Sequence, residues 1–361
     1  MFLLENYTLA VLFCFITMLC WGSWGNTQKL AGKTWRFELF YWDFVLGIFL
    51  LSLVCALTAG NLGAHDRGFF ADLSQANVES LGWAFLGGVV FNIANILLVA
   101  AIAIAGLSVA FPVGIGLALV LGVILNYVAK PAGDPTVIFL GVALIAVAIV
   151  INAIAYRKLP GQNSAVGTKG LVLSILCGIL MSTFYYFVAN SLAGVELTAE
   201  VAQTLKVEVN KEGVTNTITA ATLKEGTLQA GKLTAYTANF IFALGILLSN
   251  IIVNTVVMLK PFIGTPVSPL AYFKGTPKDH LWGIIGGCIW GVGMSCNIVA
   301  SNVASPAIAY GLGQGATLVS AIWGVFIWKE FKTAPKGTEK LLGIMFLLFV
   351  VGLGLIIYAK M

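Results

Sequence analysis

Long apolar stretches alternate with short polar segments along almost the whole chain. Each stretch holds roughly 20 residues or more, which is the length that a helix needs to cross the hydrocarbon core of a bilayer. We therefore predict about ten membrane-spanning helices, with ends placed to within a few residues. Their expected limits are 7–28, 38–60, 81–104, 107–128, 136–156, 168–193, 234–259, 281–303, 306–328 and 340–359.

The two halves of the chain also repeat each other. When residues 81–158 are aligned with residues 280–360 without a gap, small and polar residues coincide. The coinciding pairs include Gly88 with Gly287, Ala101 with Ala300, Gly114 with Gly313, and Lys130 with Lys329. Repetition at half-length is typical of transporters that rock two halves around a central site. We expect an all-α polytopic membrane protein made of two inverted five-helix repeats, because an odd number of crossings reverses the second copy.

The expected domains are a first repeat over residues 1–158, a short cytoplasmic linker over 159–167 and a second repeat over 168–361. The second repeat carries an extracytoplasmic polar insert at 196–232. Polarity alternates from residue 205 to residue 218 around a turn-like segment, which predicts a β-hairpin that leans on the membrane domain.

Glycine and proline suggest where the spanning helices are interrupted. They gather around residues 112–116 in the first half and 311–315 in the second half. Interruptions at matching positions of two repeats point to the binding region. The glycine-rich run 311–315 is not expected to bind a nucleotide, because no strand precedes it and no phosphate-binding lysine follows.

Composition and charge agree with a membrane protein. The chain has 361 residues, of which 59% are hydrophobic and only 10% charged, whereas soluble domains carry about 25% charged residues. The basic residues concentrate in the loops after every second span, so these loops are expected on the cytoplasmic side. We expect an integral protein of the cytoplasmic (inner) membrane of a bacterium, with both termini outside the cytoplasm, an uncleaved first span and no affinity for nucleic acid.

Metal and cofactor chemistry is not expected. The six cysteines lie in apolar stretches and are interpreted as reduced packing residues. His65 and His280 fall in predicted loops, so no metal site is expected. Without a histidine inside the spans, and with one well-placed carboxylate, an intramembrane enzyme is disfavoured. The remaining classes are a transporter and, less favoured, a channel or signalling subunit.

Amide and aromatic side chains recur in the middle of several spans, where burial of a polar group is costly. They can join helices through hydrogen bonds, or they can line a cavity for a neutral solute. The candidate substrate-binding residues are Trp24, Asn95, Tyr186, Asn250, Trp290, Asn297 and Gln314. Spans 136–156 and 340–359 are almost free of polar groups and are expected at the periphery, away from the cavity.

Carboxylates are rare in the spans. Asp43 lies about two turns into the second span, and Glu38 lies at its edge. A buried carboxylate that gains and releases a proton can couple transport to a proton gradient. Asp43 is therefore the first candidate for proton coupling, and Glu38 the second. The alternative is that Asp43 lies near the cytoplasmic interface and pairs with Lys33 or Arg36.

The chain resembles the drug/metabolite transporter superfamily, whose members have ten spans in two five-helix repeats. Within it the chain is most similar to the ureide permeases, with the rhamnose–proton symporters and the glucose/ribose porters as cousins. The segments that carry the resemblance are Cys20-Trp21-Gly22-Ser23-Trp24, Tyr41-Trp42-Asp43, Gly87-Gly88 to Asn95, Gly106-Leu107-Ser108-Val109, Leu125-Asn126-Tyr127, Gly286-Gly287 to Asn297, and Leu318-Val319-Ser320-Ala321-Ile322-Trp323-Gly324.

The resemblance implies proton-coupled uptake, by alternating access, of a small neutral solute such as a ureide, a nucleobase or a sugar. No cofactor is expected beyond a proton or other ion gradient, and the expected partners are the lipid bilayer and the solute. The chain departs from the plant ureide permeases in its short central loop and in the polar insert after the sixth span. An exporter or facilitator of the same fold is the alternative, and the sequence leaves open whether the protein is a monomer or a homodimer.

Overall fold

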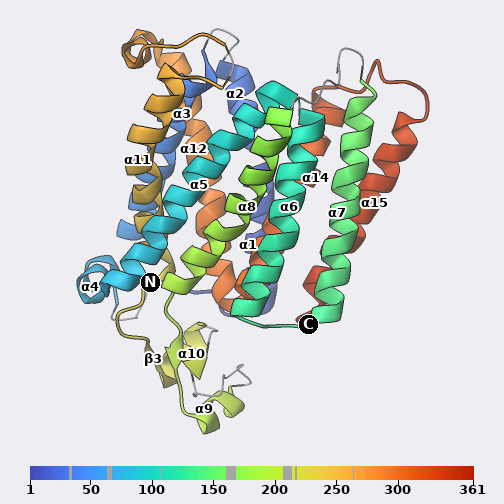
Figure 1. Ribbon diagram of the computed structural model, residues 1–361. Helices are drawn as coiled ribbons and strands as arrows, with labels where there is room; N and C mark the ends of the chain where they lie inside the picture. Colours follow the sequence, from blue (N-terminus) through green and yellow to red (C-terminus); the bar gives the residue numbers. More distant parts are fainter. Residues whose placement is uncertain are drawn as a thin grey trace.

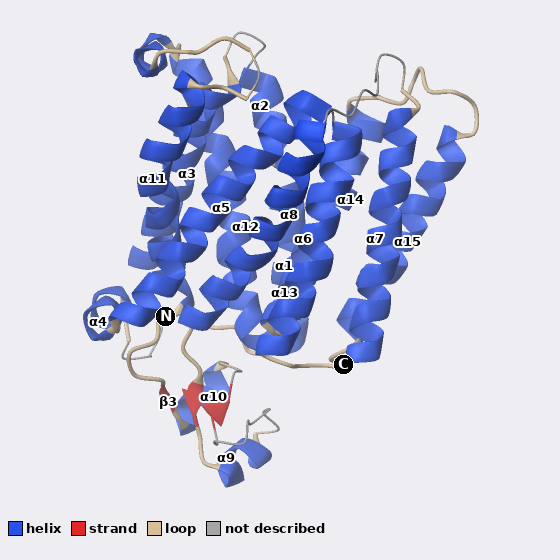
Figure 2. Ribbon diagram, in the orientation of Figure 1, coloured by secondary structure: helices blue, strands red, loops and turns tan. Residues whose placement is uncertain are grey.

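The computed structural model describes residues 1–31, 35–62, 67–105, 107–159, 168–205, 214–215, 218–262 and 264–361. In this part of the chain, nine helices are long and apolar enough to cross a membrane, and a shorter apolar helix covers Val113–Ala129. The protein is therefore an all-α polytopic membrane protein, as the apolar stretches predicted. Its long helices stand side by side in one bundle (Figures 1 and 2).

The helices follow the predicted order along the chain. The spanning elements are α1 (Tyr7–Ser23) with α2 (Gly25–Ala31), α3 (Phe37–Leu57), α5 (Val78–Ala105), α6 (Leu107–Ala129), α7 (Pro135–Arg157), α8 (Thr168–Ser191), α11 (Ala235–Leu259), α12 (Pro277–Ala304), α13 (Pro306–Gly313) with α14 (Ala316–Ile322) and η2 (Trp323–Ile327), and α15 (Thr338–Tyr358). The shorter helices are α4 (Phe69–Gln75), α9 (Ala199–Thr204), α10 (Ala220–Glu225) and the 3₁₀ helix η1 (Pro269–Lys274).

Both termini lie at one end of the bundle, together with α4, α9 and α10 (Figure 1). We call this end the terminal face. The opposite end, which we call the loop face, carries the segment between α11 and α12 and the segment between η2 and α15 (Figure 1). The termini share a face because an even number of spans returns the chain to the side on which it started.

The first and ninth spans are interrupted helices. Trp24 separates α1 from α2, and the ninth span changes from α13 to α14 around Gln314 and then to the π-helix η2. The interruption predicted near residues 311–315 is therefore confirmed. The one predicted near residues 112–116 is wrong, because α6 runs without a break from Leu107 to Ala129.

Helices from the two halves cross in backbone contact at glycines. A methyl group added at Gly88 of α5 would overlap the carbonyl oxygen of Phe242 in α11, and one at Gly287 of α12 would overlap that of Phe44 in α3. The facing glycines on α3 and α11 are Gly47 and Gly245. Small residues permit such close approach in lipid, where van der Waals packing drives helix association. These glycines therefore set the distances between the central helices.

Helices α7 and α15 pack against each other at one side of the bundle (Figure 1). At their crossing, a Cβ on Gly141 would lie 2.7 Å from the carbonyl oxygen of Gly352, and the reverse distance is the same. The peripheral placement expected for these helices is therefore confirmed. Neither helix lines the central cavity described below, although Ile149 and Asn152 of α7 line the outer cavity beside it.

The polar insert forms a small three-stranded sheet on the terminal face. Its central strand β1 (Val195–Glu196) pairs antiparallel with β2 (Val214–Thr215) and β3 (Thr227–Leu228). Most of the predicted hairpin falls on residues 206–213 and 216–217, which lie outside the described residues. The described strand β2 pairs with β1 across the insert.

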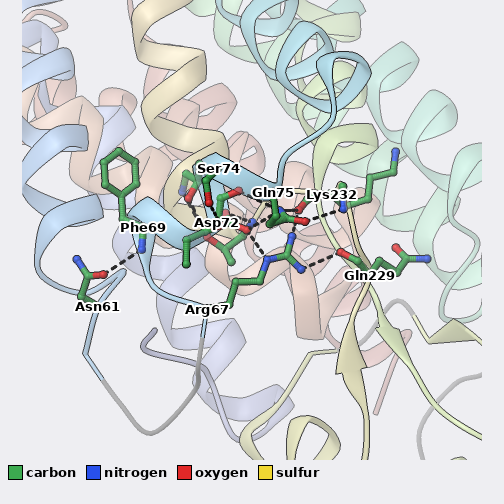
Figure 3. A network of polar contacts seen from close by, with 12 residues as sticks. Asn61, Arg67, Phe69, Asp72, Ser74, Gln75, Gln229 and Lys232 are labelled. Atoms are coloured by element: carbon green, nitrogen blue, oxygen red, sulfur yellow. Dashed lines mark hydrogen bonds and ion pairs between the residues drawn. The ribbon is translucent and has the colours of Figure 1, made fainter.

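A polar network fastens the end of the insert to the membrane domain (Figure 3). Arg67 Nε lies 2.6 Å from Oδ1 of the buried Asp72, and Arg67 Nη1 donates to the carbonyl oxygen of Gln229 at 2.8 Å. The amide of Thr234, which caps α11, donates to Asp72 Oδ2 at 2.8 Å. Breaking a buried ion pair leaves an uncompensated charge, so this network holds α4, the insert and the start of α11 together.

Candidate functional site

A cavity of about 120 Å³ lies between the central helices. We call it the central cavity. Its lining comes from both halves of the chain and consists of Trp21, Trp24, Phe91, Asn95, Leu98, Ile115, Met181, Phe184, Trp290, Gln314, Ala316, Thr317 and Ser320. None of these side chains carries a formal charge. The central cavity is therefore suited to an uncharged ligand, since a buried ion requires an opposite charge.

Aromatic rings form much of the cavity wall. The rings of Trp21 and Trp290 stack, with centroids 5.6 Å apart and an angle of 12° between their planes. Phe91 packs against Trp290 at 4.5 Å, and the indole nitrogen of Trp21 donates to the carbonyl oxygen of Trp290 at 3.3 Å. These contacts hold α1, α5 and α12 together and fix the ring faces before a ligand binds.

The polar groups of the cavity come from α5 and from the interrupted ninth span. Asn95 Nδ2 donates to the hydroxyl of Tyr41 at 3.1 Å, which fixes the orientation of its amide. Thr317 Oγ1 donates to the backbone carbonyl of Gln314 at 3.2 Å, and Ser320 Oγ donates to that of Gly22 at 3.0 Å. The interruption between α13 and α14 places Gln314 and Thr317 together beside the cavity.

A second cavity of about 230 Å³ adjoins the first and shares Trp21, Trp24, Thr317 and Ser320 with it. We call it the outer cavity. Its lining also includes Asn26, Lys29, Ile149, Asn152, Trp323, Trp328 and Glu330. Lys29 Nζ and Glu330 Oε1 form an ion pair of 2.7 Å between α2 and the segment after η2. The two cavities together lead from the middle of the bundle toward the loop face.

Two buried tyrosines, Tyr185 and Tyr310, lie on the terminal side of the central cavity. Tyr310 donates to the carbonyl oxygens of Ala118 at 3.2 Å and Met181 at 3.3 Å. Tyr185 donates to the carbonyl oxygen of Asn297 at 3.2 Å, and its ring lies 5.5 Å from that of Tyr310. These bonds join α6, α8, α12 and α13 into a layer beneath the cavity, which we call the tyrosine layer.

The structure brings only some of the predicted binding residues to the central cavity. Trp24, Asn95, Trp290 and Gln314 line it. Three other predicted residues, Tyr186, Asn250 and Asn297, do not line it.

Helix rotation explains why these three residues lie elsewhere. Asn297 Nδ2 donates to the carbonyl oxygen of Ala309 at 2.8 Å and so ties α12 to α13. Asn250 is fully buried and lies outside the cavity lining. Tyr186 is half-buried on another face of α8, and its neighbour Tyr185 is the tyrosine that points inward.

Sequence reasoning missed several apolar members of the lining, among them Trp21, Phe91 and Phe184. A signal existed for Trp21, which precedes Trp24 by almost one helical turn and therefore shares its face. No comparable signal marked the two phenylalanines, because phenylalanine is common on every face of a spanning helix.

A polar cluster at the loop face surrounds Asp43. His280 Nδ1 lies 3.0 Å from Asp43 Oδ2 and 3.1 Å from Oδ1, and the hydroxyl of Tyr272 also donates to Asp43 Oδ1. Arg36 pairs with Glu38 at 2.6 Å, so the expected Asp43–Arg36 pair is wrong. Lys33, the other expected partner, lies outside the described residues.

His280 was expected in a loop, and this expectation is wrong because α12 begins before it. Thr276 caps the helix by accepting a hydrogen bond from the amide of Asp279 at 3.3 Å, and Pro277 occupies the first turn. These capping residues start the helix four positions before the predicted limit. In the first turn, His280 faces Asp43 of α3.

The residue types around the cavities and around Asp43 indicate which ligands they can bind. Among the described residues, no cluster of three or more His, Cys, Asp or Glu side chains is placed to bind a metal ion. The lining combines aromatic faces with neutral amides, and Asp43 is set apart from it. A bundle of spanning helices around such a cavity is the architecture of membrane transporters.

The comparison with known families identifies the particular group. Residues 40–166 and 212–359 match the ureide permease family. Since this match covers most of the chain, the protein belongs to the ureide permease family. The relatives that match along the chain are named ureide permeases, so the protein is a transporter of small solutes.

Individual relatives match along nearly their whole length. Ureide permease 1 of Arabidopsis thaliana is 25% identical over 99% of this chain and 98% of its own. Ureide permease 2 of the same plant is 24% identical over 97% of this chain and 96% of its own, and probable ureide permease A3 of Vigna unguiculata is 22% identical over 93% and 99%. A solved crystal structure shares the fold, with a TM-score of 0.55 and 14% identity over 96% of this chain and 97% of that one.

Proposed function

We propose that the protein is a secondary active transporter that imports a small neutral polar solute of the ureide, nucleobase or sugar class. The observation that carries the proposal is the central cavity, whose lining combines indole faces with the amides of Asn95 and Gln314 and has no charged side chain. Stacking of a flat polar ring on an aromatic side chain is worth about 1–3 kcal/mol. The amides supply donors and acceptors for the same ring's polar edge.

Asn95, Gln314, Trp24 and Trp290 are the proposed substrate-binding residues. Because one N–H of Asn95 Nδ2 is bound to Tyr41, its carbonyl oxygen and its second N–H remain for hydrogen bonds with the solute. The side-chain amide of Gln314 can both donate and accept hydrogen bonds. Its position at the helix interruption brings it to the cavity. A solute with adjacent N–H and C=O groups matches both amides.

Alternating access is proposed as the transport mechanism. It is supported by the contrast between the two sides of the central cavity. The outer cavity adjoins it toward the loop face, whereas the buried tyrosine layer lies toward the terminal face. In the other conformation, the tyrosine layer would separate and the walls of the outer cavity would close, so that the solute is exposed to one side at a time.

We also propose that residues 1–158 and 168–361 are inverted repeats, joined by the linker 159–167. The glycine crossings support this proposal, because each contact has a counterpart in the other half. Gly88 of α5 meets Phe242 of α11, and Gly287 of α12 meets Phe44 of α3. In the proposed repeat, α5 corresponds to α12 and α3 corresponds to α11. The contact of α5 with α11 is therefore equivalent to the contact of α12 with α3.

Transport is proposed to be driven by a proton gradient through Asp43. Its carboxylate is buried, and its neighbour Phe44 packs against Trp24 of the cavity at 4.6 Å. A change of charge at Asp43 can therefore act on the cavity wall through one aromatic contact. Glu38 is less suitable, because it is already neutralised by Arg36. Export or facilitated diffusion is the alternative if no gradient is coupled.

The loop face is proposed to face the cytoplasm, with both termini and the insert on the other side. Basic residues support this orientation, since Lys29, Lys260, Lys329, Lys332 and Lys336 all lie in segments of the loop face. The bacterial inner membrane stays a prediction, because the relatives described above are plant proteins.

The experiment that tests the function is uptake into proteoliposomes under an imposed pH gradient, with ureides, nucleobases and sugars as competitors. We expect concentrative uptake that one of these classes inhibits. Asn95→Ala and Gln314→Ala should each raise the KM for uptake about tenfold or more, because loss of a hydrogen bond to a buried group costs about 1–3 kcal/mol.

Asn297→Ala serves as the comparison variant, because Asn297 joins two helices and does not line the cavity. It should lower the amount of folded protein and change the KM of the remaining folded protein less than the two cavity variants do. If the KM is unchanged in both Asn95→Ala and Gln314→Ala, the central cavity is not the substrate site.

A further inference from the structure

The pair formed by Asp43 and His280 connects a buried carboxylate to water at the loop face. The side chain of Asp43 is 1% exposed and that of His280 is 25% exposed, and 3.0 Å separates Asp43 Oδ2 from His280 Nδ1. The two residues belong to different halves of the chain, on α3 and α12. Neither lines the central cavity or the outer cavity.

Few charged groups lie near the Asp43–His280 pair. Tyr272 from η1 donates to Asp43, and Trp35 packs edge-on against the His280 ring with centroids 5.2 Å apart. On α12, Asp279 precedes His280 and accepts hydrogen bonds from Thr276. On α3, Glu38 is paired with Arg36. Within the described residues, no lysine or arginine forms an ion pair with Asp43.

Of the two described side chains that are hydrogen-bonded to Asp43, only His280 is able to pass a proton onward. Burial, together with the hydrogen bond to Asp43, raises the pKa of Tyr272 above its ordinary value. The phenol therefore keeps its proton at neutral pH and acts only as a hydrogen-bond donor. An imidazole, by contrast, has two ring nitrogens and exchanges protons near neutral pH, so it can accept at one nitrogen and release at the other.

We propose that His280 relays the coupling proton between Asp43 and water at the loop face. The inference rests on the proposed proton coupling at Asp43. When Asp43 is protonated, its carboxyl group transfers the proton to His280 Nδ1, which leaves a carboxylate and an imidazolium. The imidazolium then releases the proton on Nε2 to water, and the neutral ring donates Nδ1–H to the Asp43 carboxylate.

The relay is complete without any further reactant. One proton leaves Asp43 and one proton leaves His280 Nε2, so the imidazole ring carries no net charge before and after the relay. The partly exposed ring then returns from the Nδ1–H tautomer to the Nε2–H tautomer by exchanging protons with water. Tyr272 stabilises the carboxylate that remains. Release toward the loop face thus requires the contact between α3 and α12 that this conformation makes, so proton release is tied to the state in which the outer cavity adjoins the central cavity.

The decisive variant is His280→Gln, because glutamine can still donate a hydrogen bond to Asp43 but cannot relay a proton. In proteoliposomes, we expect solute exchange between two loaded sides to stay within about twofold of the wild type. The initial rate of uptake driven by a pH gradient should fall at least about tenfold. Tyr272→Phe, which removes the neighbouring hydroxyl and leaves the imidazole, should keep gradient-driven uptake within about threefold.

A chemical rescue covers the case in which His280→Gln does not fold. His280→Ala leaves room for a free imidazole, and imidazole added on the loop side should restore gradient-driven uptake in a concentration-dependent manner. Methylated imidazole that cannot release a proton from its second nitrogen should not restore it.

The outcomes separate the relay from the function on which it rests. If the wild type does not concentrate solute under a pH gradient, the proposed symport itself fails. If the wild type does so, Asp43→Asn does not, and His280→Gln transports at the wild-type rate, then symport stands and the relay is overturned. Failure of imidazole to rescue His280→Ala, in a folded protein that still exchanges solute, would also overturn it.

Discussion

Asp43 illustrates how much the chemistry of one side chain depends on its neighbours. In sequence it is a carboxylate near the start of a spanning helix. In the structure it is shielded from water and hydrogen-bonded to Tyr272 and His280, which come from a segment more than two hundred residues away along the chain. A carboxylate in such a place is suited to change its charge when the surrounding helices move apart.

The role of Asp43 can be measured with a conservative substitution. Asp43→Asn keeps the size and hydrogen bonding of the protonated carboxyl group but cannot release a proton. We expect it to retain solute exchange and to lose accumulation driven by a pH gradient. Glu38→Gln is the matched control, since Glu38 lies on the same helix and is paired with Arg36. Accumulation that persists in Asp43→Asn and disappears in Glu38→Gln would transfer the coupling role to Glu38.

The packing of helices depends on where the chain lacks side chains. Gly88 and Gly287 allow α5 and α12 to touch the backbones of α11 and α3, because a Cβ at either position would overlap a backbone carbonyl oxygen. The interrupted helices shape the cavity in another way. Where the helix is interrupted, backbone groups lose their helical partners, and side chains such as Gln314 turn toward the cavity. The π-helix η2, which lies at the outer cavity, belongs to a class of distortion that is frequent at functional sites.

Alanine at the glycine crossings tests this interpretation. Gly88→Ala and Gly287→Ala should each lower the free energy of unfolding by about 1–3 kcal/mol, the usual cost of overpacking. Thermal unfolding in detergent measures the effect. Gly343→Ala on α15 is the control, since a Cβ there meets no atom within 4 Å, and the higher helix propensity of alanine should leave it neutral or slightly stabilising. Equal thermal stability of all three variants would show that the crossings are loosely packed.

The bundle as a whole is asymmetric between its two faces. Cavities reach toward the loop face, whereas buried tyrosines and the insert lie toward the terminal face. A transporter needs a second conformation in which this asymmetry is reversed, and the pseudo-equivalent contacts between the halves offer a way to build it from the same parts.

Accessibility of introduced cysteines can show both conformations. All six native cysteines are unpaired thiols, so the measurement requires a background in which they are replaced. In that background, Ser320→Cys should react with a membrane-impermeant thiol reagent from the loop face, because Ser320 lines both cavities. Ala307→Cys, which is fully buried in α13 beyond the tyrosine layer, should be protected from the loop face. Simultaneous reaction of Ser320→Cys from both faces would indicate an open channel.

Some features of this protein follow from local sequence alone. Helix number, approximate limits and the polytopic class were predictable, because a helix in lipid must satisfy its own backbone hydrogen bonds and its length is fixed by the bilayer. The scarcity of charge likewise predicted a neutral cavity. Trp24, Asn95, Trp290 and Gln314 were recognisable as polar or aromatic groups in the middle of their spans.

Tertiary structure decided which polar groups meet. Helix rotation directs Asn297 to the backbone of Ala309 and leaves Asn250 outside the cavity, although both are amides in the middle of a span. The helix start at Thr276 brings His280 to Asp43, 237 residues away in sequence. Periodicity constrains the spacing of side chains along one helix, but the face turned toward a neighbour is set by contacts with other helices, and these contacts form only when the whole bundle packs.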